Sequence, residues 1–221
     1  MKYKMNKNKL LFWAAWVLLV SMVPLTILNG TGMPLATSPV LLANLAQRVL
    51  GLLVFVLLFS QLMIGANMHW FIDKLGAWVF KFHIVEGVTI YTLVVLHTIG
   101  FLLFNYFSGK GFDPFYVFLG FCILCENATE LLYTLGRISF WLLTIAVFAG
   151  LLRTATPFLR IHWRKFHVLN YLVFLLVGVH GFFVGTDFRT MPFFIVGAGA
   201  YLFVLMIVIK RALISYKRQW D

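Results

Sequence analysis

The stretch FHIVEGVTIYTLVVLHTIGF, from Phe82 to Phe101, is almost wholly apolar but carries two histidines, His83 and His97, fourteen residues apart. On an ideal helix, fourteen steps of about 100° bring the second side chain back to within about 40° of the first. The same steps separate the two histidines by about 21 Å along the axis, inside a hydrocarbon core of about 30 Å. The stretch therefore predicts a membrane-spanning helix with one histidine near each end.

A second stretch, WRKFHVLNYLVFLLVGVHGF from Trp163 to Phe182, also carries two histidines, His167 and His180, which are thirteen residues apart. Thirteen steps leave two side chains about 140° apart on an ideal helix. Either this helix is distorted, for instance near Gly178, or its two rings reach their partners from different sides. The two stretches together predict two helices that hold one cofactor above the other.

The composition indicates an integral membrane protein. Hydrophobic residues make up 62% of the chain and charged residues 11%, against roughly a quarter charged in soluble proteins. Apolar runs long enough to cross a lipid bilayer recur along the sequence, and 221 residues leave no room for a sizeable soluble domain. The net charge is +11. Its lysines and arginines lie mostly at the ends of these apolar runs, as in membrane proteins, so we expect no nucleic acid partner. The two cysteines do not indicate a disulfide framework.

We predict an all-α membrane protein, a bundle of six transmembrane helices that occupies residues 10–209, between basic tails at residues 1–9 and 210–221. The expected spans are Leu10–Leu28, Leu41–Gly65, Phe82–Phe101, Gly136–Leu152, Trp163–Phe182 and Phe193–Ile209. Residues 29–40 and 184–192 are expected to be loops, and residues 66–81 and 153–165 connectors. The run from Phe115 to Cys125 is too short to span, and with Glu126 to Tyr133 it predicts a shallow interfacial segment.

The basic residues indicate the orientation. Six spans put both termini on one side, and 14 of the 18 lysines and arginines fall in the two tails and the two connectors. The other four are Arg48, Lys110, Arg137 and Arg189. Since basic residues collect on the cytoplasmic side, we expect a multi-pass protein of the plasma membrane with both termini cytoplasmic. His83 and His167 then lie at the cytoplasmic level, and His97 and His180 at the outer level.

Histidines in hydrocarbon are costly and usually functional. A neutral imidazole bound to haem iron avoids that cost and fixes a cofactor. The alternative is four separate histidines that hydrogen-bond across helices. Because two helices carry matched pairs, we predict that two haems lie between the third and fifth helices. The expected axial ligands of the haem iron are His83, His97, His167 and His180.

Three charged residues lie near the predicted cofactors. Arg48 and Arg137, near the outer ends of the second and fourth helices, can neutralise haem propionates or can extend to the lipid headgroups. Glu86 lies one turn above His83. We expect it to pair with Lys81 at the interface, and a proton relay is the alternative.

Two cysteines and two further histidines are of residue types that often have functional roles, but we expect none of the four to be functional here. Cys122 and Cys125 form CILC on the expected outer side, where a redox pair is one interpretation. The segment is apolar, so two inert thiols are expected. His69 and His162 fall in the connectors and are expected to be solvated loop residues.

The FH…LH pattern of the third helix, the basic connector leading into WRKFHVLNYLVF, and VHGFFVGTD resemble the ferric reductase-like transmembrane domain family. This family includes the membrane cores of ferric reductases and NADPH oxidases, and the resemblance runs from about Leu45 to the end. It implies a six-helix bundle with two b-type haems, each held by two histidines. It also implies cofactor contacts for Arg48, which falls where the family often has an arginine in its second helix.

The sequence departs from that family at its end. Family members continue after the sixth helix into a flavin and nicotinamide-nucleotide domain, whereas this sequence ends at Asp221 and has no GxGxxG that follows a strand. We expect the chain to conduct electrons, with FAD and NAD(P)H bound only by a separate partner or by a removed domain.

Three functions are compatible with these features. The first is a dihaem b-type cytochrome, an oxidoreductase component without assigned catalytic residues. It carries electrons from a cytoplasmic reductase to an outer acceptor such as ferric iron, oxygen or a partner protein. The second is a quinol-linked haem membrane anchor of an outer-side reductase. The third is a transporter or scaffold with structural histidines.

Overall fold

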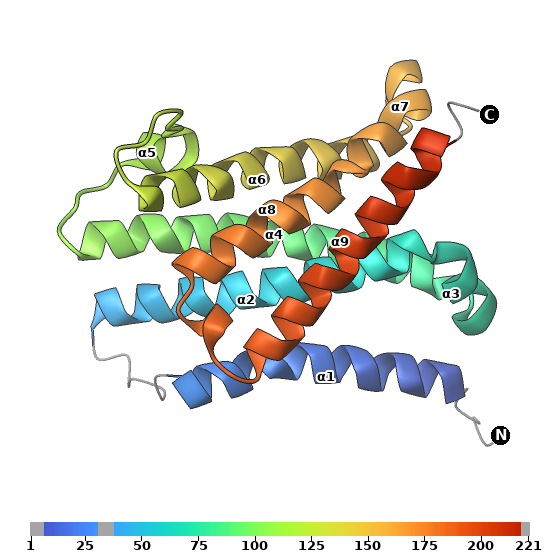
Figure 1. Cartoon of the computed structure of the whole chain (residues 1–221), viewed down its shortest axis with the longest axis horizontal. Coiled ribbons are helices and arrows are strands. Elements are labelled where there is room, and N and C mark those ends of the chain that lie inside the picture. Colours follow the sequence, from blue (N-terminus) through green and yellow to red (C-terminus); the bar gives the residue numbers. More distant parts are fainter. Residues whose placement is uncertain (1–6, 31–37, 218–221) are drawn as a thin grey trace.

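The structure, a computed structural model, describes residues 7–30 and 38–217. Residues 1–6, 31–37 and 218–221, which belong to the predicted tails and first loop, lie outside the described part. Within that part every regular element is helical, and six helices are long and apolar enough to cross a membrane. The prediction of an all-α protein with six candidate spans is confirmed (Figure 1).

The helices follow one another with short connections. In chain order they are α1 (Lys7–Gly30), α2 (Pro39–Ala66), α3 (Met68–Leu75), α4 (Trp78–Phe107), α5 (Pro114–Leu119), α6 (Ala128–Leu151), α7 (Pro157–His167), α8 (Leu169–Val184), the 3-10 turn η1 (Asp187–Arg189) and α9 (Phe193–Lys217). Helices α7 and α8 together form the fifth candidate span. Helices α3 and α7 lie at the end of the bundle where α1 begins and α9 ends, and α5 lies at the opposite end (Figure 1).

Capping residues explain where several helices begin. The Asn127 side chain accepts a hydrogen bond from the Glu130 N–H, and the Thr156 hydroxyl accepts one from Leu159 N–H before Pro157 opens α7. Helix α6 therefore starts at Ala128, two turns before the predicted Gly136. The expectation that residues 126–133 form a shallow interfacial segment is wrong for residues 128–133, and much of the expected basic connector is helix α7.

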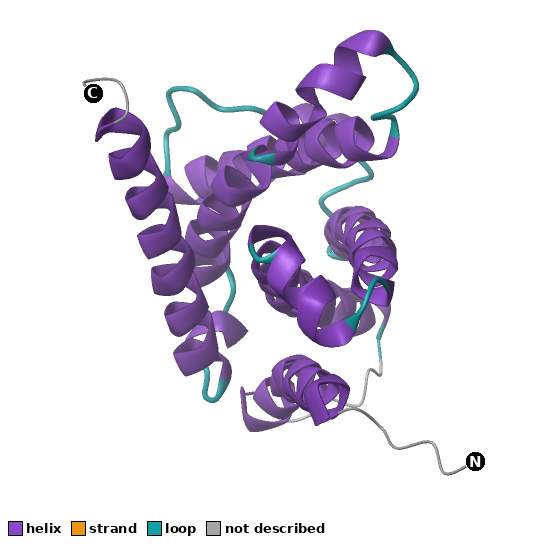
Figure 2. Cartoon of the chain, turned by 90° about the vertical axis from the view of Figure 1, so that its right-hand side faces the viewer, coloured by secondary structure: helices purple, strands orange, loops and turns teal. Residues whose placement is uncertain are grey.

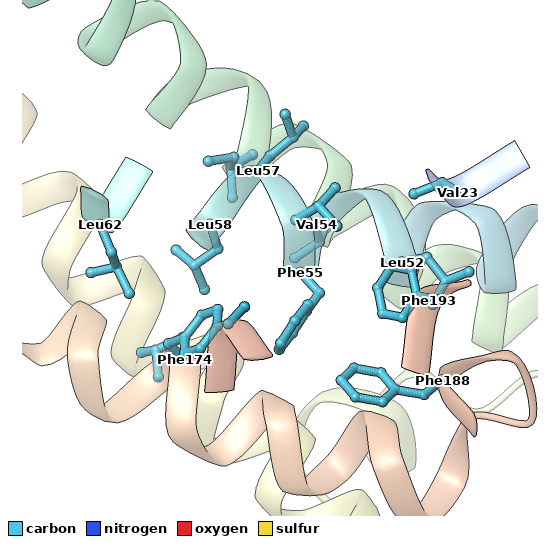
Figure 3. Packing of buried hydrophobic residues seen from close by; sticks show 14 of the residues in the cluster. Val23, Leu52, Val54, Phe55, Leu57, Leu58, Leu62, Phe174, Phe188 and Phe193 are labelled. Atoms are coloured by element: carbon cyan, nitrogen blue, oxygen red, sulfur yellow. The ribbon is translucent and has the colours of Figure 1, made fainter. Parts of the chain in front are cut away.

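The core is centred on α2, which packs most extensively against α4, while α6 packs most extensively against α8. Phe55 of α2 stacks on Phe174 of α8 with ring centres 4.7 Å apart, and the Phe188 ring meets Phe55 edge-on at 4.8 Å (Figure 3). Helix α9 crosses the bundle obliquely (Figures 1 and 2). Helix α4, which carries His83 and His97, and helix α8, which carries His180, are thus each held against a partner helix, α2 and α6 respectively.

Candidate functional site

Each histidine of α4 faces a glycine of α2. A Cβ atom added at Gly51 would lie 3.0 Å from Cε1 of His97, and one added at Gly65 would lie 3.3 Å from Cε1 of His83. The two glycines are fourteen residues apart, as are the two histidines. Because α4 is uninterrupted from Trp78 to Phe107, the matched spacing lets both rings lie close to the α2 backbone.

The second helix pair repeats this arrangement. A Cβ atom added at Gly136 of α6 would lie 3.0 Å from Cε1 of His180, and one added at Gly150 would lie 3.5 Å from Nδ1 of His167. These glycines are also fourteen residues apart. Sequence reasoning missed all four glycines, although the repeated fourteen-residue spacing was a signal that could have identified them.

The structure brings the histidines together across the two helix pairs, at two levels. The ring centres of His83 and His167 are 6.1 Å apart, with planes inclined by 70°. His97 and His180 are close enough to interact electrostatically. Two imidazoles that bind one metal ion from opposite sides, with bonds of about 2 Å, have ring centres roughly 6 Å apart. The approach of His83 to His167 agrees with the expected pairing by depth, and their separation is compatible with a shared metal ion, while binding of haem iron by the four histidines stays a prediction.

Backbone carbonyls orient three of the four rings. Nδ1 of His97 lies 2.7 Å from the Gln47 carbonyl oxygen, Nδ1 of His180 lies 2.8 Å from that of Leu132, and Nδ1 of His167 lies 3.4 Å from that of Ala146. A carbonyl oxygen can only accept, so Nδ1 carries the proton and Nε2 keeps its lone pair for a metal. Nδ1 of His83 is buried and has no hydrogen-bond partner among the described residues.

A break between α7 and α8 accounts for the thirteen-residue spacing. Helix α7 ends at His167 and α8 begins at Leu169, with Val168 between them. The Val168 N–H bonds to the carbonyls of Arg164 and Phe166, which tightens the chain there. The distortion predicted for this helix is therefore present, but at Val168 and not near Gly178.

Arg48 forms an ion pair that the sequence analysis did not identify. Its Nε and Nη2 atoms donate to the two carboxylate oxygens of Asp187, each at 2.5 Å, and the Asp187 side chain is 5% exposed. The pair joins α2 to η1, across 139 positions of sequence. Arg48 directly follows Gln47, so the pair fixes the backbone that holds His97.

Arg137 is buried and does not extend to the surface. Its Nη1 donates to the Gly120 carbonyl at 2.5 Å, its Nε donates to the Val117 carbonyl at 3.4 Å, and its guanidinium lies over the Tyr116 ring. Nη2 is buried and has no hydrogen-bond partner among the described residues. The guanidinium is close enough to His180 to act on it electrostatically. Arg137 therefore places a buried N–H group that makes no hydrogen bond to the described residues beside the level of His97 and His180.

Glu86 is also placed differently from the expectation. Its side chain is buried and accepts a hydrogen bond of 2.8 Å from Nε1 of Trp16 in α1. The expected pairing with Lys81, which is exposed, is wrong because Glu86 faces α1 and not the interface.

The structure also corrects the expected roles of the cysteines and the connector histidines. Cys122 and Cys125 are joined by a disulfide, so the expectation of two free thiols is wrong. His69 and His162 were expected in loops, but they lie in α3 and α7. His162 stacks on Phe158 with ring centres 4.6 Å apart.

A polar cavity of about 430 Å³ lies at the α5 end of the bundle. Its lining includes Phe101, which lies one turn after His97, and the Phe101 ring meets the Tyr133 ring with centres 5.2 Å apart. Charged and polar side chains of the lining include Lys110, Asp113, Asn105, Asn127, Thr129 and Glu130. The cavity is lined by α4 residues that begin one turn after His97, and hydropathy alone did not reveal it.

Comparisons with protein-family models, with curated proteins and with solved structures give no match to this chain.

Proposed function

We propose that this chain is a dihaem b-type transmembrane cytochrome that carries electrons across the lipid bilayer. The observation that carries the proposal is the pairing of four histidines at two levels between two helix pairs. His83 and His167 face each other at 6.1 Å, and His97 and His180 pair about 21 Å further along α4. The resemblance to the ferric reductase-like family supports the same conclusion.

The donor set fits a haem better than a bare metal ion. Among the described residues there is no group of three or more His, Cys, Asp and Glu side chains that could hold an ion alone. A haem iron takes four ligands from its macrocycle and needs only two from the protein. When bound, such a haem supplies reversible one-electron chemistry, and the protein sets ligation and polarity around it.

The chain's own groups prepare the ligands. The carbonyls of Gln47, Leu132 and Ala146 hold the imidazoles in one tautomer, so Nε2 stays available. The opposed glycines let each ring sit against its neighbouring helix without a side chain between them.

We assign different roles to Arg48 and Arg137, although both were expected to neutralise haem propionates or to extend to the lipid headgroups. Asp187 occupies two nitrogens of Arg48, which assigns Arg48 mainly to holding α2 near His97. Nη2 of Arg137 is buried and has no hydrogen-bond partner among the described residues, and the side chain lies beside His180. We assign Arg137 as the group that binds a haem propionate at that level, since a guanidinium pairs well with a carboxylate.

The direction of transfer follows from the charge distribution. Basic residues concentrate at the end of the bundle that carries α3 and α7, and we assign this end to the cytoplasm and the membrane to the plasma membrane. The electron donor is then a soluble cytoplasmic reductase that supplies FAD and NAD(P)H. The polar cavity near Phe101 and Lys110 would receive the outer acceptor.

The test is a haem-to-protein ratio with a reduced-minus-oxidised spectrum of the purified protein. We expect about two b-type haems per chain, both bound by two histidines. A matched control, His69→Ala with His162→Ala, removes the two histidines outside the paired set and should leave the ratio unchanged. Protein that is folded and monodisperse but binds no haem when haem is supplied would contradict the proposal and favour structural histidines.

A further inference from the structure

Residues 112–125, which we name the α5 wedge, expose an unusual amount of apolar surface. Ile123 and Leu124 are 93% and 94% exposed, at the tip of the loop closed by the Cys122–Cys125 disulfide. Four more large apolar side chains of the wedge are exposed: Phe112, Phe115, Leu119 and Phe121. In water, such a surface would be costly.

Side chains of α6 bind backbone groups in the last turn of α5 and in the loop that follows it. Arg137 donates to the carbonyls of Val117 and Gly120, and Nε1 of Trp141 donates to the Phe118 carbonyl at 3.0 Å. The Cys122 N–H donates to the Thr134 hydroxyl at 3.1 Å. Irregular backbone is tolerated at membrane depth only where such protein partners replace water.

The wedge also continues the lipid-facing surface of α6. Trp141 lies thirteen residues after Ala128, about 20 Å along the helix, and it is partly exposed together with Ile138 and Ile145. Because the Trp141 indole binds the wedge, the wedge surface and this apolar face of a membrane span adjoin. The ribbon shows α5 lying over the first turns of α6 (Figure 1).

Charge is almost absent from the wedge. Its one charged residue is Asp113 near the start, and that carboxylate accepts a hydrogen bond from the Tyr116 N–H as the N-cap of α5. A docking face for a soluble protein carries a polar rim around its apolar centre. The wedge tip itself, Cys122 to Cys125, holds no charged side chain, and the exposed polar residues Glu126 and Asn127 follow it directly. An apolar tip beside polar residues suits a segment that enters lipid from the headgroup side.

We propose that the α5 wedge is inserted into the acyl-chain region of the leaflet at its end of the bundle, with Ile123 and Leu124 as the deepest contacts. The partner is the lipid of the surrounding bilayer. The inference does not depend on haem binding. It assigns the segment a membrane-anchoring role that also places Arg137 and the polar cavity at a fixed depth.

The test is a photo-crosslinking amino acid at position 124 of the otherwise unaltered full-length protein in nanodiscs of one defined phosphatidylcholine. The matched control carries the same amino acid at position 110, since Lys110 is exposed on the neighbouring loop. After irradiation, intact-mass measurement should show a phospholipid adduct at position 124 at least several-fold more often than at position 110.

Two results would overturn the proposal. One is an equal adduct yield at the two positions, which would place the tip in water or headgroups. The other is a crosslink from position 124 to a second copy of the chain in place of lipid. Because the Leu124 side chain is almost fully exposed, the substitution removes no core contact. Monodisperse elution confirms that both variants are folded.

Discussion

The two histidine levels differ in how firmly their rings are held. At the level of His97 and His180, both Nδ1 atoms lie within 2.8 Å of a backbone carbonyl oxygen, and a Cβ added at the facing glycine would lie 3.0 Å from each ring. At the other level, His167 has a hydrogen bond of 3.4 Å, and Nδ1 of His83 has no partner among the described residues. The first level is preorganised and the second is looser.

The difference follows from the helices at each level. His97 and His180 lie inside α4 and α8, where Gln47 and Leu132 of the neighbouring helices offer carbonyls. His167 is the last residue of α7, beside the break at Val168. A ring at a helix break has fewer fixed neighbours, so ligand binding must supply part of its orientation. Local packing can thus distinguish two sites that look equivalent in sequence.

The largest expected effect is loss of a whole cofactor. Each single change of His83, His97, His167 or His180 to Ala should lower the haem-to-protein ratio from about two to about one, because one axial ligand is removed. The comparison of levels can be tested by adding apomyoglobin as a haem acceptor. Protein with only the His97 level intact should then lose its haem more slowly than protein with only the His83 level intact. The opposite order of retention would break the comparison.

Removing Arg48 should have the next largest effect. Arg48→Ala leaves the Asp187 carboxylate buried and unpaired, which we expect to cost roughly 3 kcal/mol of stability. The loss should appear as a lower thermal midpoint and weaker haem retention at the His97 level. The double variant Arg48→Ala, Asp187→Ala should recover most of the stability. A double variant as unstable as the single one would show that the pair is not what holds α2 there.

The glycine contacts offer a finer comparison. Gly51→Ala and Gly136→Ala crowd rings at 3.0 Å, whereas Gly150→Ala meets His167 at the ordinary distance of 3.5 Å. Overpacking costs about 1–3 kcal/mol, so the first two should weaken haem binding and the third should not. Gly199→Ala is the control, because an added Cβ there would meet no atom of the described residues within 4 Å. Equal weakening by Gly136→Ala and Gly150→Ala would count against a tighter His97 level.

The smallest expected effect comes from the disulfide. Cys122→Ser with Cys125→Ser should leave the haem-to-protein ratio and donor-driven haem reduction unchanged, since the disulfide lies in the wedge and supplies no haem ligand. Transmembrane transfer to an added outer acceptor is the informative assay. A large loss of transfer with both haems retained would make the cysteine pair part of the conduit.

Much of the fold could be predicted from the sequence because it depends on average hydropathy and periodicity. The six spans required only long apolar runs, and the depth of each histidine required only the rise of a helix. The pairing of His83 with His167 followed because both helices cross in the same direction.

Other features depend on particular contacts that hydropathy does not encode. The start of α6 depends on Asn127 as a cap, and the break at Val168 depends on which carbonyls its N–H reaches. The ion pair between Arg48 and Asp187 and the bond between Trp16 and Glu86 join residues far apart in sequence. Such partners are selected by the packed bundle, so the sequence alone suggested a haem propionate or lipid headgroups for Arg48, and Lys81 or a proton relay for Glu86.

The most direct test of the pairing compares two double variants. His83→Ala with His167→Ala removes both ligands of one level, and His83→Ala with His180→Ala removes one ligand from each level. Pairing by level predicts about one haem per chain in the first variant and none in the second. If the second variant retains as much haem as the first, the proposed pairing, and the two-level cytochrome built on it, is contradicted.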